Sequence, residues 1–304
     1  MSTTTAPRSS GSFEWPEGEP YEDVQRGTLK SGKEAEIFLV ERRFARSGPR
    51  LLAHKRYRPR YPVKGQLKEE GFSNSTSYRG DSVYKAGWFL PTRDKKAVLG
   101  GSRFGHELAA KLWPMQEWAM LSRAWQAGAS VPYPVEQTEL GLIMEFVGDD
   151  AQAAPKLVEA RLGADELPSA WQQLQSSIVA LTMAGLVHAD LSPYNILWWQ
   201  GRLVIIDLPQ AVDAAGNNHA QRMLLRDVAN LRDFFGRFAP ELLATQFGAE
   251  IWALYTRGVL QPATPLTGRF EERQGPVDVA GVLRVVDDAL DEEAARLLRM
   301  RTAG

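Results

Sequence analysis

GLVHADLSPYNIL at residues 185–197 and LVIID at residues 203–207 are the stretches from which the fold of this chain can be predicted. They contain a carboxylate at Asp190, a carboxamide five positions later at Asn195, and a second carboxylate at Asp207, after an apolar run. Phosphoryl transfer requires little covalent chemistry of a protein and much positioning of charge, metal and nucleophile. These three side chains therefore suit Mg-nucleotide chemistry.

Each of the three residues has an expected role. Asp190 can accept or orient the proton of an attacking hydroxyl, and Asn195 and Asp207 offer the hard oxygen ligands that Mg²⁺ prefers. The run 196–206 predicts two short buried strands joined by a turn at 200–202, which would hold Asp207 rigidly beside Asn195. Single Asp and Asn residues near loops are usually caps and turn formers. The combination of spacing and flanking strands favours catalysis.

The same segment resembles the catalytic and metal-binding loops of the RIO family of atypical serine/threonine protein kinases. The family patterns are close to H-x-D-L-S-x-Y-N-I-L and I-I-D-x-P-Q, and this chain has HADLSPYNIL and IIDLPQA. Pro193 stands where the family often has an acidic residue, and Leu208 where Phe is usual. Neither change removes a catalytic group. The resemblance implies a two-lobed α+β protein-kinase-like fold, ATP and Mg as cofactors, and Asp207 as a transient acceptor of phosphate.

Composition excludes several other classes of protein. The chain has 304 residues, 44% of them hydrophobic, which permits a full core. Zero cysteines exclude disulfides, thiolate catalysis and Cys-based metal sites, and none of the four histidines pair at i, i+4. A net charge of -1 argues against overall attraction to nucleic acid or membrane. No apolar run approaches the ~20 residues of a membrane span, and no signal peptide is recognisable, so we expect a cytoplasmic protein.

The domain organisation follows from composition and from the resemblance. Residues 1–20 are rich in Ser, Thr, Gly and Pro and predict a disordered tail, too short for the N-terminal winged helix of one RIO branch. We expect a small β-rich lobe at 21–147 and a mainly helical lobe at 148–304. Only residues 208–218 separate Asp207 from the next amphipathic helix, and no Ala-Pro-Glu motif follows, so the chain lacks a conventional activation segment.

A glycine-containing turn near the N-terminus predicts a flap over the nucleotide phosphates. Residues 27–33 match the start of a Walker A loop, but Glu34 stands where a Ser/Thr hydroxyl should meet Mg, and the next residues alternate like a strand. The segment resembles the RIO flap S-T-G-K-E-A, with Lys30-Ser31 replacing Ser-Thr. By that resemblance Ser31 and Lys33 would contact nucleotide. An ordinary hairpin turn is the alternative.

Lys55 and Glu117 are candidates for the phosphate clamp. Residues 51–57 predict a third strand, with Lys55 where kinases keep the phosphate-binding lysine. Glu117 lies on a predicted helix whose apolar residues recur at +3 and +4 and which would end near Gly128. In the kinase arrangement Glu117 would pair with Lys55 and aim it at the α and β phosphates. Otherwise Lys55 is one more solvated charge.

A strand and turn at residues 142–150 predict the crossing between the lobes. The sequence MEFVGDD resembles the RIO pattern M-E-F-x-G-D-D. The resemblance implies that the Glu145 carbonyl and the Val147 amide contact adenine and that Met144 lines the pocket. A plain core strand is the alternative.

Two further segments suggest partners. The polar insert from 58 to about 105 is longer than ordinary connections and is expected to be flexible. The resemblance to the RIO family implies that the insert can carry autophosphorylated serine or threonine. The candidates for that modification, by their chemistry alone, are Ser73, Ser75, Thr76 and Ser77. Between residues 41 and 60 eight basic residues face one acidic residue. The basic segment 42–60 would bind RNA, a ribosomal particle or a phosphorylated partner, or it is the solvated edge of a hairpin.

The remainder predicts helices. Apolar residues step by 3 and 4 at 167–181, before Gly185, and again at 224–235. The chain from about Pro240 looks helical, and residues 279–290 continue the pattern in a final helix.

The expected activity is Mg-ATP-dependent phosphorylation of serine or threonine on a protein substrate or on the chain itself, or ATP hydrolysis. Two rivals stay open. One is a small-molecule phosphotransferase of the aminoglycoside-kinase type, which shares an H-x-D-x-x-x-x-N loop. The other is a nucleotide-binding scaffold in ribosome or RNA assembly.

Overall fold

The computed structural model describes residues 15–32, 35–58, 103–149 and 152–270. The chain divides into two units, residues 1–269 and 270–304, and the lobe boundaries expected from the sequence stay a prediction. The following predictions lie outside the described residues: the first 14 residues of the tail, Lys33, the insert at 59–102 with its four hydroxyl candidates, and the helix at 279–290. None of the described helices is long and apolar enough to cross a membrane.

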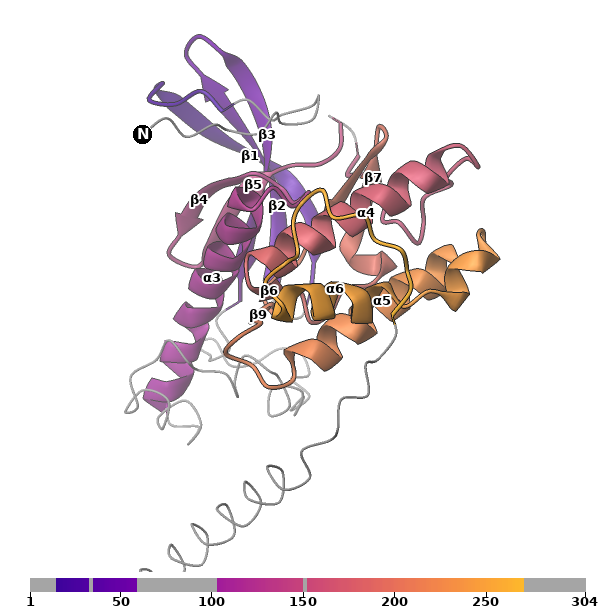
Figure 1. Ribbon diagram of the computed structural model, residues 1–304. Helices are drawn as coiled ribbons and strands as arrows, with labels where there is room; N and C mark the ends of the chain where they lie inside the picture. Colours follow the sequence, from indigo (N-terminus) through magenta and orange to yellow (C-terminus); the bar gives the residue numbers. More distant parts are fainter. Residues whose placement is uncertain (1–14, 33–34, 59–102, 150–151, 271–304) are drawn as a thin grey trace, which may run out of the picture. The chain divides into compact units, whose positions relative to one another are not determined.

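An antiparallel five-stranded sheet forms the small lobe, in the order β1-β2-β3-β5-β4 (Figure 1). The alternation of the sequence and its glycine turns account for the strands. They are β1 (Tyr21–Ser31), β2 (Ala35–Phe44), β3 (Gly48–Tyr57), β4 (Pro134–Thr138) and β5 (Gly141–Glu145). The predicted strands of the flap, of the lysine and of the crossing between the lobes are therefore confirmed.

Helix α3 (Arg103–Gln126) is the single described helix of this lobe and packs against β3, β4 and β5. It ends before Gly128, whose φ of +82° is the left-handed conformation that commonly terminates helices. Of the apolar residues spaced at +3 and +4, Leu121 is buried, and Trp118 and Trp125 are partly buried and pack against the core.

The chain before β1 is also packed. Trp15 stacks on Tyr133 with ring centroids 6.0 Å apart and meets Phe44 edge-on at 5.1 Å. Glu19 accepts a hydrogen bond from the Ser47 amide at 3.0 Å and another from the Ser47 hydroxyl at 2.6 Å. Residues 15–20, which we assigned to the tail, therefore contact the sheet.

The second half of the first unit is mainly helical. Its core is built from the apolar stripes of the helices and from the two strands that flank the loop at residues 188–195. The elements are α4 (Glu166–Met183), β6 (Leu186–Val187), η2 (Pro193–Asn195), β7 (Ile196–Trp199), β8 (Arg202–Ile205), β9 (Val212–Asp213), α5 (Ala220–Phe235), η3 (Pro240–Ala244) and α6 (Phe247–Thr256).

Two details differ from the sequence expectation. The turn between β7 and β8 is two residues long, because Gln200 and Gly201 take φ of +49° and +77° and form a tight hairpin, so Arg202 pairs with Trp199 in the ladder. Between Pro240 and residue 270, where the description of the chain ends, the expected helical character holds for η3 and α6. Residues 257–270 contain no helix, and Gly258 and Gly268 both have positive φ there.

Candidate active site

Lys55 is the centre of a charged cluster that joins three distant parts of the chain. Its Nζ lies 2.7 Å from Oε1 of Glu117, on α3, and 2.7 Å from Oδ1 of Asp207, which follows β8. The hydroxyl of Tyr57, two residues further along β3, donates to Oε2 of Glu117. The ion pair expected between Lys55 and Glu117 is thus present, and Tyr57 is an addition that the sequence did not indicate.

The electrostatics of the cluster follow from its burial. Burial alone would lower the pKa of Lys55, but Glu117, Tyr57 and Asp207 together raise it well above its usual value. Lys55 in turn lowers the pKa of Asp207, against the opposing effect of burial. Burial raises the pKa of Glu117 and outweighs the effect of Lys55. The ammonium and the Asp207 carboxylate are therefore both charged at neutral pH.

Asp207 follows β8 and has a strained backbone conformation. Its φ of +68° is rare for a non-glycine residue and turns the side chain out of the line of β8. The preceding residue is fixed on both sides: the Ile206 amide donates to the Asn195 carbonyl at 2.9 Å, and His188 Nε2 lies 3.1 Å from the Ile206 carbonyl. The Asp207 side chain keeps 48% of its surface exposed. It is held in place yet open to a ligand.

Asp190 and Asn195 share one loop and contact each other. The Asn195 side-chain NH₂ donates to the Asp190 carbonyl at 2.8 Å and lies 3.3 Å from Asp190 Oδ2. With its amino group used in this way, Asn195 presents its oxygen as an acceptor. That oxygen and the open Asp207 carboxylate fit Mg²⁺, which is usually held by one or two protein oxygens together with phosphates and water. No group of three His, Cys, Asp or Glu ligands occurs among the residues described.

The loop of Asp190 is anchored from beneath by Asp227 of α5. The Ala189 amide donates to Asp227 Oδ2 at 2.8 Å, and Arg226 donates to the Ala189 carbonyl. Ala189 has a φ of +66°, so these bonds hold it in an unfavourable conformation next to Asp190. Burial raises the pKa of Asp227 to about 6, although Arg226 and the backbone donors oppose the shift. The carboxylate is therefore a buried anchor for the loop.

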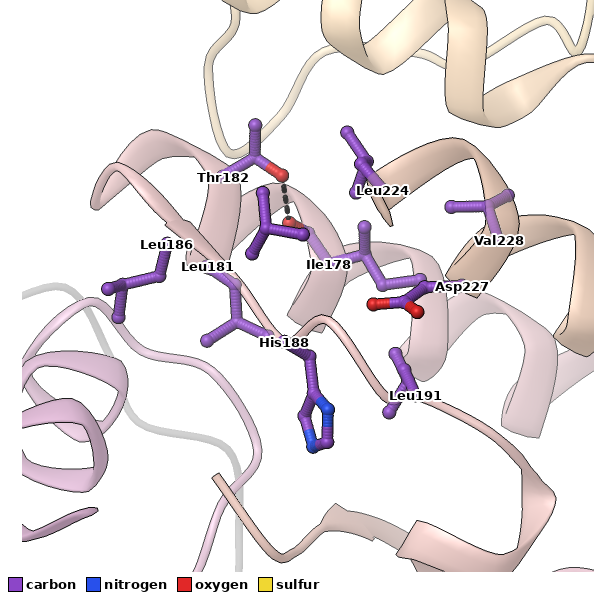
Figure 2. Close-up of a pocket in the computed structure, with 10 residues that line it drawn as sticks. Ile178, Leu181, Thr182, Leu186, His188, Leu191, Leu224, Asp227 and Val228 are labelled. Atoms are coloured by element: carbon purple, nitrogen blue, oxygen red, sulfur yellow. Dashed lines mark hydrogen bonds between the residues drawn. The ribbon is translucent and has the colours of Figure 1, made fainter. Parts of the chain in front are cut away.

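Figure 2 shows the Asp227 carboxylate with its neighbours in a small cavity of about 10 Å³ lined by residues of α4, the 186–191 segment and α5. Such a volume holds about one water molecule. The sequence contained a signal that we did not use: Asp227 lies in the middle of the apolar face formed by Leu224, Val228 and Leu231. An acidic residue in that position is buried, and a buried carboxylate needs partners.

At the crossing between the lobes, Glu145 and Val147 differ in which of their hydrogen-bonding groups already have partners. The Glu145 carboxylate is buried, accepts the Tyr133 amide at 3.1 Å and pairs with Arg202 of β8. The Val147 carbonyl accepts the Ala154 amide at 2.9 Å, whereas the Val147 amide donates to no backbone carbonyl of the described residues. Met144 is partly buried beside the core. An amide with no backbone acceptor in the described part of the chain suits adenine.

Ser31 is not brought to the charged cluster. Its hydroxyl lies at the end of β1, where it accepts a hydrogen bond from Arg58 at 2.7 Å and lies 3.4 Å from Glu36. Its proposed contact with nucleotide remains a prediction.

The basic segment 42–60 is largely paired within the protein. Arg42 is buried and donates to Asp23 at 2.7 Å and to Glu136 at 3.0 Å. Arg43 pairs with Glu41, and Arg58 with Glu36. Fewer cations are therefore available to RNA than the sequence suggested, and binding of RNA or a ribosomal particle stays a prediction.

Comparison with known proteins agrees with the motifs. The family model described as the RIO domain matches residues 80–247. A curated relative, the RIO-type serine/threonine-protein kinase Rio1 of Haloferax volcanii, is 38% identical over 143 residues, 45% of this chain and 48% of that protein. The human serine/threonine-protein kinase RIO3 is 36% identical over 126 residues, 41% of this chain and 24% of that protein. The chain thus spans about half, or less, of the length of these relatives.

Among solved structures, this chain is similar to the Rio2 kinase of Chaetomium thermophilum in a complex with ADP, Mg²⁺ and phosphoaspartate. The match covers 70% of this chain and 56% of the chain of that kinase. The sequence identity is 20% and the TM-score 0.46. The family model spans more than half of the 304 residues, including Asp190, Asn195 and Asp207. On that match, the chain belongs to the RIO kinase family.

Proposed function

We propose that this protein transfers the γ-phosphoryl group of Mg-ATP to a serine or threonine of a protein, or of its own chain, and hydrolyses ATP when water takes the place of the acceptor. One observation carries the proposal: Lys55 lies 2.7 Å from both Glu117 and Asp207. A buried lysine held between a helix glutamate and a metal-binding aspartate is the arrangement that kinases use to position the phosphates.

The residues of the chain divide the work. Lys55, oriented by Glu117, neutralises charge on the α and β phosphates. Asp190 lies next to Asn195 at an exposed position, where it can accept the proton of an incoming hydroxyl. The anchored Ala189 keeps Asp190 in place without any side-chain bond to the charged cluster. Positioning of this kind removes a large part of the barrier to phosphoryl transfer.

The metal would be held by the Asn195 side-chain oxygen and the Asp207 carboxylate. Bound Mg²⁺ neutralises the charge on the β and γ phosphates and aligns them for transfer. In the structure Lys55 contacts Asp207 directly. The second oxygen of Asp207, Oδ2, would be the one available to hold the metal, since Oδ1 contacts Lys55.

Adenine would be bound at the crossing between the lobes. The Val147 amide, which has no backbone acceptor among the residues that the structure describes, would be the donor. The Glu145 carbonyl is the expected acceptor, and Met144 would provide an apolar wall. The names of the relatives, which are serine/threonine-protein kinases, support a protein acceptor.

The decisive experiment follows the label of [γ-³²P]ATP after incubation with the purified chain. We expect label on a seryl or threonyl residue, or released as phosphate, in the presence of Mg²⁺ and neither after chelation with EDTA. Label on a small hydroxylated acceptor instead would establish the aminoglycoside-kinase rival. Binding of ATP with no transfer to protein, small acceptor or water would establish the scaffold rival and refute our proposal.

An additional variant tests the transient use of Asp207. In the wild-type chain an acyl phosphate would be sensitive to hydroxylamine, whereas phosphoserine and phosphothreonine resist it. Hydroxylamine-sensitive label that disappears in Asp207→Asn would support an aspartyl phosphate on the path to hydrolysis.

A further inference from the structure

The flap strand β1 contains two register shifts, one between Gln25 and Gly27 and one between Thr28 and Lys30, and the second lies next to the candidate active site. Thr28 pairs with Phe38 of β2, yet the next paired residue is Lys30, opposite Ile37, so Leu29 is an extra residue in the ladder. A bulge of this kind changes the face on which the following side chain emerges, and bulges are common beside active sites. If Leu29 were paired with Ile37, Lys30 would lie opposite Glu36, which is now the partner of Ser31. The Lys30 side chain would then point to the opposite face of the sheet.

The shift places Lys30 in line with Lys55. Ile37, the partner of Lys30, is also the partner of Lys55 on β3. Residues directly opposite each other in antiparallel strands project from the same face of a sheet. Lys30 and Lys55 therefore share one face, two strands apart, which is about 10 Å at the usual strand spacing. Because Lys55 contacts Asp207, this face is the one turned toward the metal-binding carboxylate.

The charge of Lys30 is available for a ligand. Its side chain is exposed, and among the described residues it forms no ion pair. It is nevertheless near enough to Asp207 to contribute to the lowering of the pKa of that carboxyl, after Lys55 and His188. Asp207 is about half exposed. Two cations thus flank the open carboxylate, one buried and paired, the other exposed and unpaired.

We propose that Lys30 binds the γ-phosphate of Mg-ATP, as a second phosphate-binding lysine that closes over the triphosphate from the flap. The inference rests on the proposed function, because it takes ATP as the ligand. Lys55 serves the α and β phosphates, so a cation two strands further out reaches the terminal phosphate. An ammonium donates up to three hydrogen bonds and compensates the negative charge of the γ-phosphate.

Lys30 is a feature of this chain and not of the family pattern that it resembles. The RIO flap has S-T-G-K-E-A, and Lys30 stands at the position of its first Ser. A serine there offers one hydroxyl, whereas the lysine adds a full charge. The substitution Lys30→Ser therefore restores the family residue and is a mild change at an exposed position.

The test is isothermal titration calorimetry of wild type and Lys30→Ser with AMP, ADP and ATP in the presence of Mg²⁺. We expect the dissociation constant of ATP to rise about tenfold or more, because a hydrogen bond to a charged group commonly contributes that much. That of ADP should rise less than about threefold, and that of AMP should not change, since neither has a γ-phosphate.

Two control variants separate position from charge. Arg46→Ser removes one charge at the β2–β3 turn, at the opposite end of the sheet, and should leave all three dissociation constants unchanged. The swap Leu29→Lys with Lys30→Leu keeps the net charge but moves the ammonium to the bulged position, and it should bind ATP as weakly as Lys30→Ser.

Three results would overturn the inference: unchanged ATP affinity in Lys30→Ser, an equal loss of affinity for ATP and ADP, or wild-type affinity in the swapped variant. Each of them leaves the proposed function intact if the wild-type chain binds Mg-ATP. Failure of the wild-type chain to bind ATP at all would instead refute the proposed function and this inference with it.

Discussion

The candidate active site consists of two regions that are held in different ways. The charged cluster of Lys55, Glu117 and Asp207 is assembled by ion pairs between side chains that are far apart in the sequence. The loop of Asp190 and Asn195 is fixed through its backbone, by Asp227 beneath Ala189 and by the bond between Asn195 and Ile206. The cluster is mostly buried, and Asp190 is exposed.

Because of this difference, we expect a substitution in the charged cluster to lower both activity and stability, and a substitution of an exposed residue on the loop to lower activity alone. A buried charge without its partner is costly, so a change in the cluster affects the fold as well as the chemistry. An exposed side chain on an anchored loop contributes little to folding, so a change there affects chemistry alone. Four substitutions test this contrast, from the largest expected effect on turnover to the smallest.

Asp190→Asn tests the exposed member of the loop. We expect turnover to fall by about 10²- to 10⁴-fold, the usual contribution of a positioned acid or base. The free energy of unfolding should change by less than about 0.5 kcal/mol, because the side chain is on the surface. Release of label from [γ-³²P]ATP and urea unfolding measure the two quantities. Undiminished turnover would refute the role of Asp190.

Lys55→Met tests the buried cluster. We expect turnover to fall by about 10²- to 10³-fold, as for the loss of one group that stabilises transition-state charge. Stability should also fall, by about 3 kcal/mol, because Glu117 loses the partner of its buried charge. A double variant, Lys55→Met with Glu117→Leu, should recover part of the stability but none of the activity. If Lys55→Met were as stable as Asp190→Asn, the contrast between the regions would be wrong.

Asp227→Asn tests the anchor through its pH dependence. The pKa of Asp227 in the folded protein, about 6, lies above the ordinary value of 3.8. The folded state therefore binds the proton more tightly than the unfolded state, and the resulting stabilisation is present below pH 3.8 and is lost as the pH rises through about 6. Asparagine cannot titrate. The stability of wild type relative to the variant should thus decrease by about 2.5 kcal/mol from pH 4 to pH 7.

Urea unfolding of both proteins at several pH values measures that difference. The neighbouring groups that also bear charge or titrate are Arg226, bonded to Asp227, and His188, which lines the same cavity. A difference that does not vary with pH would show that Asp227 is not the titrating anchor. In turnover we expect about a tenfold loss, because the loop beside Asp190 is less well fixed.

Arg202→Met tests a contact between the two lobes at some distance from both regions. Arg202 pairs with the buried Glu145 but is itself about one-third exposed, so its contribution should be near 1 kcal/mol. We expect KM for ATP to rise about two- to fivefold with kcat unchanged, since Glu145 belongs to the segment that we propose to bind adenine. Arg202→Lys should be intermediate. A fall in kcat at constant KM would contradict this assignment.

Much of the fold was predictable because the sequence patterns are local. Alternation and glycine turns predicted β1, β2, β3 and β5, and steps of three and four predicted α4 and α5, whose stripes contain the buried Leu174, Ile178, Leu224 and Leu231. The Lys55–Glu117 pair was predictable only through a resemblance, because 62 residues separate the two side chains. The expectation of helix was wrong for residues 257–270, where Gly258 and Gly268 have positive φ.

The roles of Asp227, Arg202 and Lys30 were not predictable from the patterns that we used. The buried Asp227 carboxylate needs hydrogen-bond donors, and one of them is the backbone amide of Ala189. Every residue except proline has such an amide, so the amino-acid sequence does not show which one Asp227 contacts. Arg202 was assigned to a turn and is instead the first residue of a strand. The residue that Lys30 faces depends on two extra residues in the ladder, Arg26 and Leu29, and the sequence of β1 does not show where such residues are.

The sequence by itself determined which chemical groups are present and their order along the chain: a loop with Asp190 and Asn195, a strand ending in Asp207, and a lysine and a glutamate on separate elements. It could do so because local periodicity and short motifs depend on neighbours within a few residues. Only the tertiary structure decided that Lys55 meets Asp207, that Asp227 supports Ala189, and that the register of β1 turns Lys30 toward the same face. Contacts between distant residues depend on packing and strand register, which no short stretch of sequence contains.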